Sequence, residues 1–239
     1  MASYTYSISQ GQLITAAFSL MGVYDADSTP SSGDLSTATV ALNLMLKEWM
    51  TKNYNLWCVT DVPITLTQGL TSYKLGPGTP TAFAAFRPLR IPMARLIYAN
   101  TTPPLQVPLI ELSRQEYNLM GQPSAQGTSN SYYYDPQLIQ GVLYLYLTPD
   151  ANPNTVVLTC QRPLADAINS TDSLDFPIEW QNALRYNLAA NLIDDFDVPE
   201  GKANRITMKA QKMLDDMLDW DQENASTFFT VNRRPAGRM

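Results

Sequence analysis

Residues 35–49 read LSTATVALNLMLKEW, and they repeat apolar side chains at steps of three and four. Because about 3.6 residues make one helical turn, this spacing places a single apolar stripe on one face of an α-helix. Ser31 or Ser32 offers a side-chain oxygen for the N-cap, and we expect the helix to end near Asn53. The stripe consists of Leu35, Ala38, Leu42, Met45 and Trp49.

Three further segments show the same helical periodicity. The first runs from Ser9 to Met21, and Gly22 can terminate it. The second opens at Asp175 and Pro177 and is closed by Val198-Pro199, and the third follows almost immediately. Their apolar positions are Leu13, Ala17 and Leu20 in the first, Trp180, Leu184, Leu188 and Leu192 in the second, and Ile206, Ala210, Met213, Met217 and Trp220 in the third.

Each of these four stripes needs a partner, because an apolar helix face that stays in water is unfavourable. The simplest arrangement packs the first two helices against the last two. We therefore expect a helical bundle domain that is discontinuous in sequence and consists of residues 1–58 and 170–224.

Between Val62 and Pro163 the period of the apolar residues changes to two, which is typical of β-strands. The runs Ile64–Thr67 and Ser72–Leu75 flank Gln68-Gly69-Leu70-Thr71, which predicts a β-hairpin. A capping-box pattern at Ser113–Glu116 predicts one short helix. Further strand candidates are Leu89–Tyr98, Leu105–Leu109, Ser131–Tyr134, Val142–Leu147 and Val156–Gln161.

Pro and Gly interrupt this middle region often, which favours a small antiparallel β-barrel or sandwich over alternating strands and helices. The expected fold class is α+β. Residues 59–169 form an inserted antiparallel β domain in this interpretation, and residues 225–239 form an extended C-terminal docking tail.

The formal net charge of −6 argues against an electrostatic grip on nucleic acid, which needs clustered Lys and Arg. The first residues lack the basic and apolar regions of a secretion signal, and no apolar run approaches the roughly 20 residues of a membrane helix. We expect a protein that is made in the cytoplasm and does not enter a membrane. Cys58 and Cys160 lack metal-ligand or redox spacing, so we expect buried free thiols.

The sequence contains no histidine, which removes His-dependent nucleophile systems, His-based zinc sites and the commonest general base. No glycine-rich phosphate loop follows a predicted strand. Three groups of acidic residues remain. We interpret the first as lying at the start of a helix, the second at a solvated helix end, and the third on the solvent-exposed face of the last helix. We therefore predict no catalytic residue, no cofactor and no metal site. The groups are Asp172, Asp175 and Glu179; Asp194, Asp195 and Asp197; and Asp215, Asp216, Asp219 and Asp221.

Aromatic residues gather in two places. The run Tyr132-Tyr133-Tyr134, with Tyr144 and Tyr146, fits strands that alternate between core and surface, and a platform for stacking sugars or bases is the alternative. The C-terminal tail combines paired Phe with Arg, which is consistent with a docking peptide or with a terminus that has no fixed structure. The tail residues in question are Phe228, Phe229, Arg233, Arg234 and Arg238.

The order of the short motifs resembles one known family, the head-to-tail adaptors of short-tailed bacteriophages, also called tail accessory factors or packaged-DNA stabilisation proteins. The similarity runs from about Ser9 to Phe196. The motifs are Thr29-Pro30-Ser31, LKEWM at 46–50, TLTQGLTSYKLG at 65–76, Arg87-Pro88, Gly121-Gln122-Pro123-Ser124, Tyr133-Tyr134-Asp135-Pro136, GVLYLY at 141–146, Asp175-Phe176-Pro177 and ALRYNLA at 183–189.

The resemblance implies a virion protein at the head-tail junction. Family members form a ring of copies, usually twelve, that attaches beneath the portal protein, extends the DNA channel and carries the tail nozzle or tail fibre proteins. In related adaptors the C-terminal segment reaches into the portal. This implies a portal-docking role for Phe228, Phe229, Arg233 and Arg234, and proximity to packaged DNA without specific binding.

Two other functions stay open at this point. A carboxylate-pair hydrolase of cell-wall glycans needs two acids about 5 to 10 Å apart, with Glu179 as a candidate. A host polysaccharide-binding tail module would instead use the middle β region.

Overall fold

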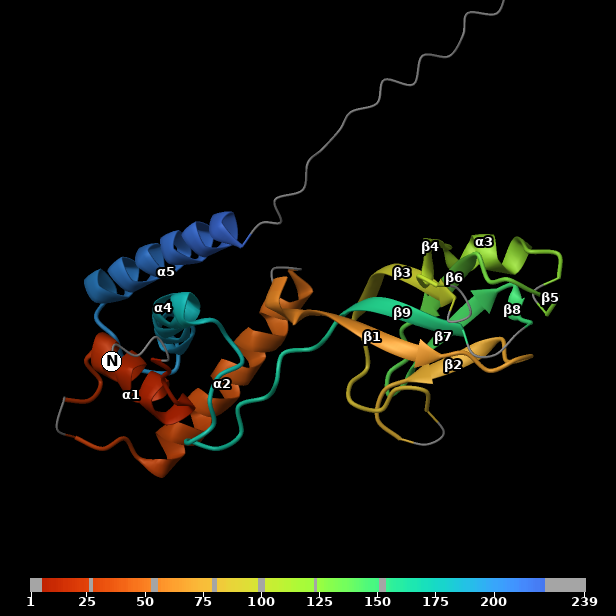
Figure 1. Cartoon of the computed structure of the whole chain (residues 1–239). Helices are drawn as coiled ribbons and strands as arrows, with labels where there is room; N and C mark the ends of the chain where they lie inside the picture. Colours follow the sequence, from red (N-terminus) through yellow and green to blue (C-terminus); the bar gives the residue numbers. More distant parts are fainter. Residues whose placement is uncertain are drawn as a thin grey trace, which may run out of the picture.

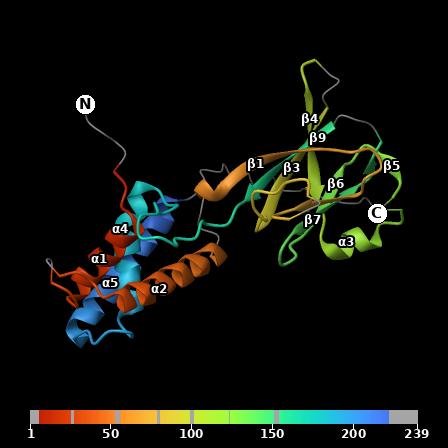
Figure 2. The same ribbon diagram turned by 90° about the horizontal axis from the view of Figure 1, so that it is seen from below.

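The computed structural model describes residues 6–25, 28–52, 56–78, 81–98, 102–122, 124–150 and 154–221. Within these residues the fold is α+β, as predicted, with five α-helices and a curled seven-stranded sheet. Figure 1 shows four of the helices gathered at one end of the molecule and the sheet at the other, and Figure 2 shows the same separation from below. None of the described helices is both long and apolar enough to span a membrane.

Local signals determine where the helices begin. The Ser9 side chain accepts a hydrogen bond from the Gln12 N–H while the Gln12 side-chain oxygen accepts one from the Ser9 N–H, and Gly22, with φ 76°, ends the helix. Ser31 caps the next helix by accepting from the Asp34 N–H. The four helices at this end are α1 (Gln10–Met21), α2 (Ser32–Thr51), α4 (Gln181–Leu192) and α5 (Glu200–Trp220).

The predicted end of the third of these helices at Val198-Pro199 is wrong. The helix α4 already ends at Leu192, and Pro199 is the residue before α5. Pro lacks an N–H, so it suits the start of a helix, where that donor has no partner within the helix. Pro199 therefore marks the beginning of the next helix.

The helix α4 lies among the other three, since it contacts α1, α2 and α5. Leu184, Leu188 and Leu192 on α4 are fully buried. One hydrophobic cluster contains buried residues from all four helices, so apolar side chains from both ends of the chain share it. This burial removes the predicted stripes from water, which is the main favourable contribution to folding.

On α5 the buried face differs from the predicted stripe. Ile206 and Ala210 are buried as expected, but the third buried residue is Leu214, and Trp220 is 60% exposed. The prediction used alternating steps of four and three, which suit a supercoiled helix.

The sheet has β1 at one edge and β2 at the other. Neighbouring strands are antiparallel except β4 and β6, which are parallel. In spatial order the strands are β1 (Val59–Thr65), β9 (Asn154–Gln161), β3 (Arg90–Tyr98), β4 (Leu105–Glu111), β6 (Ser131–Asp135), β7 (Gly141–Tyr146) and β2 (Ser72–Leu75), and a separate short parallel pair joins β5 (Gln126–Gly127) to β8 (Thr148–Pro149).

The prediction of a wholly antiparallel domain is therefore wrong at β4 and β6. Their connection contains the short helix α3 (Arg114–Leu119), which begins with the predicted capping box of Ser113 and Glu116. A parallel pair needs such a crossover, because the chain must return to the same end of the sheet. The helix was predicted correctly, but its consequence for strand direction was not.

The predicted hairpin between Ile64–Thr67 and Ser72–Leu75 does not form. All seven residues of β1 pair with β9, while β2 pairs with β7 at the far edge. The two strands are instead the opposite edges of the sheet, and each pairs on one side only. The sheet curls, so it is neither a closed barrel nor a sandwich but an open half-barrel.

The sheet carries its own hydrophobic cluster, which has no residue in common with the cluster of the helices. Alternation along β1 illustrates the cause, because Val62 and Ile64 are buried while Asp61, Pro63 and Thr65 are exposed. Successive strand residues point to opposite faces of a sheet.

Candidate functional site

The first predicted acidic group supports local structure. Asp172 accepts hydrogen bonds from the backbone N–H groups of Asn169 and Ile168 at 2.7 and 3.1 Å, and these bonds lower the pKa of its carboxyl group. The three-residue turn η2 (Ile178–Trp180), which leads into α4, has no side-chain cap. The prediction that these acids lie at the helix start and cap it is therefore wrong for Asp172 and Asp175, which bind the loop before it, whereas Glu179 does lie in the first turn of η2.

Asp175 connects the helical end to the sheet. It forms an ion pair with Arg162, which directly follows β9, and it accepts from the Ala165 N–H at 3.2 Å. Burial acts to raise the pKa of the Asp175 carboxyl group, but the hydrogen bonds from Arg162 and Ala165 and the charge of Arg162 lower it overall. The Trp57 indole N–H donates to the Asp175 carbonyl at 3.1 Å.

Four aromatic rings complete this junction. Trp57, in the short turn η1 (Leu56–Cys58) that leads into β1, lies 5.3 Å from both Phe176 and Trp180 between ring centroids. Trp49 of α2 lies 5.8 Å from Trp180. Rings at these separations attract one another beyond their area burial. The two chain segments that join the helices to the sheet are thus held against each other.

The remaining acids are mostly solvated, as predicted. Those of the turn after α4 and most of those on α5 are exposed. Asp221 is the exception, because it accepts from the Leu56 N–H at 3.3 Å and its burial raises the pKa of its carboxyl group. Glu179 is exposed and lines, with Asp216, a shallow pocket of about 100 Å³. Among the described residues, no group of three or more His, Cys, Asp or Glu is placed to hold a metal ion.

The tyrosine run alternates between the two faces of the sheet. Tyr132 is buried and its hydroxyl donates to the Ile91 carbonyl at 2.9 Å. Tyr133 lies on the other face, where its ring stacks on Tyr144 with centroids 5.8 Å apart. Tyr117 of α3 packs against both of these rings, so the helix covers this aromatic surface in part.

Both cysteines are free and fully buried, as predicted. Burial raises the pKa of the Cys58 thiol to about 11 and that of the Cys160 thiol to about 12. A thiol reacts as its thiolate, so both are inert at neutral pH in the folded protein.

Two exposed apolar surfaces were not predicted from the sequence. On α2, Val40 and Leu44 are 57% and 66% exposed, and they border a groove of about 380 Å³. In the loop between β6 and β7, Leu138 and Ile139 are 91% and 69% exposed beside another groove of about 380 Å³. For α2 the sequence did hold a signal of this exposed surface, because Val40 and Leu44 lie four residues apart and outside the predicted apolar stripe.

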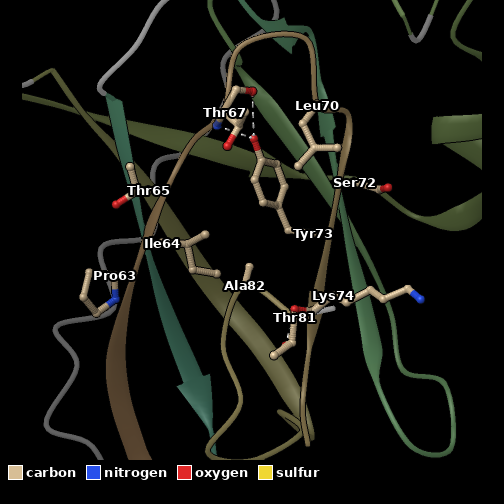
Figure 3. A pocket seen from close by; sticks show the side chains of 10 residues that line it. All are labelled: Pro63, Ile64, Thr65, Thr67, Leu70, Ser72, Tyr73, Lys74, Thr81 and Ala82. Atoms are coloured by element: carbon tan, nitrogen blue, oxygen red, sulfur yellow. Dashed lines mark hydrogen bonds between the residues drawn. The ribbon is translucent and has the colours of Figure 1, made fainter. Parts of the chain in front are cut away.

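A pocket of about 570 Å³ lies between the two edge strands of the sheet. Figure 3 shows Ile64 and Tyr73 facing each other across it. The predicted docking residues Phe228, Phe229, Arg233 and Arg234 lie outside the described residues, the last of which is Asp221.

No curated protein matches the chain. The model of a family described as SU10 adaptor protein matches residues 6–235, which include every described helix and strand. The chain therefore belongs to the SU10 adaptor protein family, a family of structural bacteriophage adaptors.

Proposed function

We propose that the protein is a head-to-tail adaptor subunit of a bacteriophage virion. Copies of it form a ring, of twelve subunits as in related adaptors, that joins the portal protein to the tail and extends the DNA channel. The observation that carries this proposal is the family match over residues 6–235. The fold supports it, because both ends of the molecule present apolar surface that other proteins can cover.

The proposed division of the chain into domains follows the two hydrophobic clusters. Residues 1–58 and 170–224 act as a helical bundle domain, residues 59–169 act as an inserted β domain, and residues 225–239 act as the docking tail. The junction of Trp57, Arg162 and Asp175 holds the two domains in one orientation, which a ring of identical subunits requires.

The outer face of α2 is a candidate contact between neighbouring copies. It exposes Val40 and Leu44, and the residues from Leu35 to Leu46 include no charged side chain. The centres of protein interfaces are depleted in charge in the same way. The Leu138 and Ile139 loop, at the other end of the molecule, is a second contact, with the tail nozzle or tail fibre proteins as its partners.

An acidic subunit also suits a channel through which DNA passes. The net charge of −6 repels phosphates, so a wall made of such subunits does not retain the DNA. The tail residues Phe228, Phe229, Arg233 and Arg234 supply the portal contact in this proposal, with the two Phe entering an apolar site and the Arg residues meeting carboxylates.

The test is reconstitution with the portal. The purified protein is mixed with its portal protein and imaged by electron microscopy, and we expect an added ring beneath the portal. A chain that ends at Ser226 should remain folded by circular dichroism and fail to add the ring. A full-length chain that never joins the portal would refute the adaptor role, whereas normal joining by the shortened chain would refute only the docking role of the tail.

A further inference from the structure

The half-barrel leaves an opening between its two edge strands, which we call the edge pocket. It is lined by β1, by β2 and by the loop that connects them, as Figure 3 shows. At one end of the opening the Tyr73 hydroxyl accepts from the Thr67 N–H at 3.0 Å and donates to the Thr67 carbonyl at 3.3 Å. The Tyr73 side chain thus bridges the opening at this point, where β1 and β2 form no backbone hydrogen bonds with each other.

The outer edge of β1 offers backbone groups for pairing. The hydrogen bonds from the Arg162 N–H to the Cys58 carbonyl and from the Leu66 N–H to the Asn154 carbonyl fix the alternation, so the even-numbered residues bind β9. The N–H and C=O groups of Asp61 and Thr65 therefore point away from β9. No hydrogen bond from the described part of the chain reaches them.

The outer edge of β2 offers fewer groups. The bond from the Leu145 N–H to the Thr71 carbonyl shows that the odd-numbered residues bind β7, so Ser72 and Lys74 face outward. The Lys74 carbonyl already accepts from the Ala82 N–H, which closes the lower part of this edge. An added strand would pair mainly with β1 and lie beside Ser72.

The lining selects a short, uncharged and partly apolar segment. Leu70 is 43% exposed and contributes apolar surface, Ile64 and Tyr73 also line the pocket but are almost fully buried, and Lys74 is the one charged residue among the described residues that line it. Pro63 has no N–H to donate from the edge of β1, which disfavours pairing with a long strand of another sheet. A segment of four or five residues avoids this penalty because it needs few backbone bonds.

We propose that Thr227–Val231 of the same chain binds in the edge pocket as an extended strand alongside β1. The described chain stops at Asp221, whose carboxylate accepts from Leu56, three residues before β1 begins. The six residues from Asp221 to Thr227 span up to about 20 Å when extended, at about 3.3 Å each, which is close to the length of β1. The segment can thus reach the pocket without strain.

The sequence of the segment fits the lining. Thr-Phe-Phe-Thr-Val contains no charge, no Pro and no Gly, and β-branched and aromatic residues favour strands. In an extended conformation Thr227, Phe229 and Val231 share one face, and Phe228 and Thr230 share the other. The first face is the more apolar, so it turns toward Ile64 and Tyr73 while Phe228 faces outward.

Hydrogen exchange measured by mass spectrometry tests this in the free protein, without the portal. We compare the full chain, a chain that ends at Asp221, Phe229→Asp and the matched control Phe228→Asp. In the full chain and the control, the amides of Asp61 and Thr65 should exchange roughly tenfold more slowly than in the other two, which equals about 1.4 kcal/mol. Peptides from α4 should exchange alike in all four and thus show that every chain is folded.

Equal exchange at β1 in the full chain and the chain ending at Asp221 would overturn the proposal, and so would equal effects of the two Asp substitutions. Protection that increases with protein concentration would also overturn it, because the segment would then come from a second copy. The proposal does not depend on the portal-docking role. Where the tail also binds the portal, the edge pocket and the portal compete for the same two Phe residues.

Discussion

Leu188 provides the sharpest test of the shared helical core. It is fully buried on α4, the helix that contacts α1, α2 and α5, so the surrounding side chains have little freedom to collapse into a cavity. Leu→Ala substitutions at such sites cost roughly 3–5 kcal/mol, the larger values belonging to rigid surroundings. We therefore expect Leu188→Ala to lower the free energy of unfolding by about 4 kcal/mol.

The assay is urea unfolding followed by far-UV circular dichroism. With a urea m-value of about 2–3 kcal/mol/M, a loss of about 4 kcal/mol lowers the midpoint by roughly 1.3–2 M. Met208→Ala on α5 is the control, because Met208 is 75% exposed and its truncation should change stability by about 0.5 kcal/mol or less. A loss below about 1 kcal/mol for Leu188→Ala would refute the reasoning, since α4 would then not be enclosed by the other helices.

Three further predictions concern the junction, the thiols and the outer face of α2. Asp175→Asn should cost about 1–3 kcal/mol at neutral pH, because it removes the carboxylate from a half-buried ion pair. The folded-state pKa of Asp175 is lowered, so its contribution is present above the unfolded pKa of about 3.9 and is lost as the pH falls through the folded value. Wild type and variant should therefore converge in acid-unfolding experiments at low pH, and a constant difference would contradict this assignment. Cys58 and Cys160, with thiol pKa values raised to about 11 and about 12, should resist a thiol reagent at neutral pH until urea unfolds the chain. Leu44→Asp should leave the circular dichroism spectrum unchanged but block ring formation on the portal, whereas Met208→Asp should not, and ring formation by Leu44→Asp would remove α2 from the subunit contact.

The helices were largely predictable because their signals are local. A serine oxygen can reach only the N–H groups of the next turn, so Ser9 and Ser31 identify helix starts without knowledge of the tertiary structure. The same holds for the capping box of Ser113 and Glu116. Trp220 was misplaced because burial near the end of a helix depends on where its neighbour stops.

Strand pairing was less predictable. The alternation that buries Val62 and Ile64 was visible in the sequence, but it is the same for every possible partner strand. The turn at Gln68–Thr71 suggested a hairpin, and only the fold shows that β1 and β2 stay apart as the two edges of the sheet. The edge pocket follows from this choice, so no local pattern could have indicated it.

For the candidate contact surfaces, too, the sequence indicated one part and the structure was needed for the other. The absence of histidine, the low charge and the order of the motifs already indicate an assembly protein. The exposure of Leu44 and the ion pair of Arg162 with Asp175 required the structure. The sequence by itself determined the helices, the strand periodicity and the chemistry that the chain lacks, because these depend on neighbours within a few residues. Only the tertiary structure decided which strands pair, which apolar faces stay exposed and where the sheet stays open, because these depend on contacts between residues that are far apart in the chain.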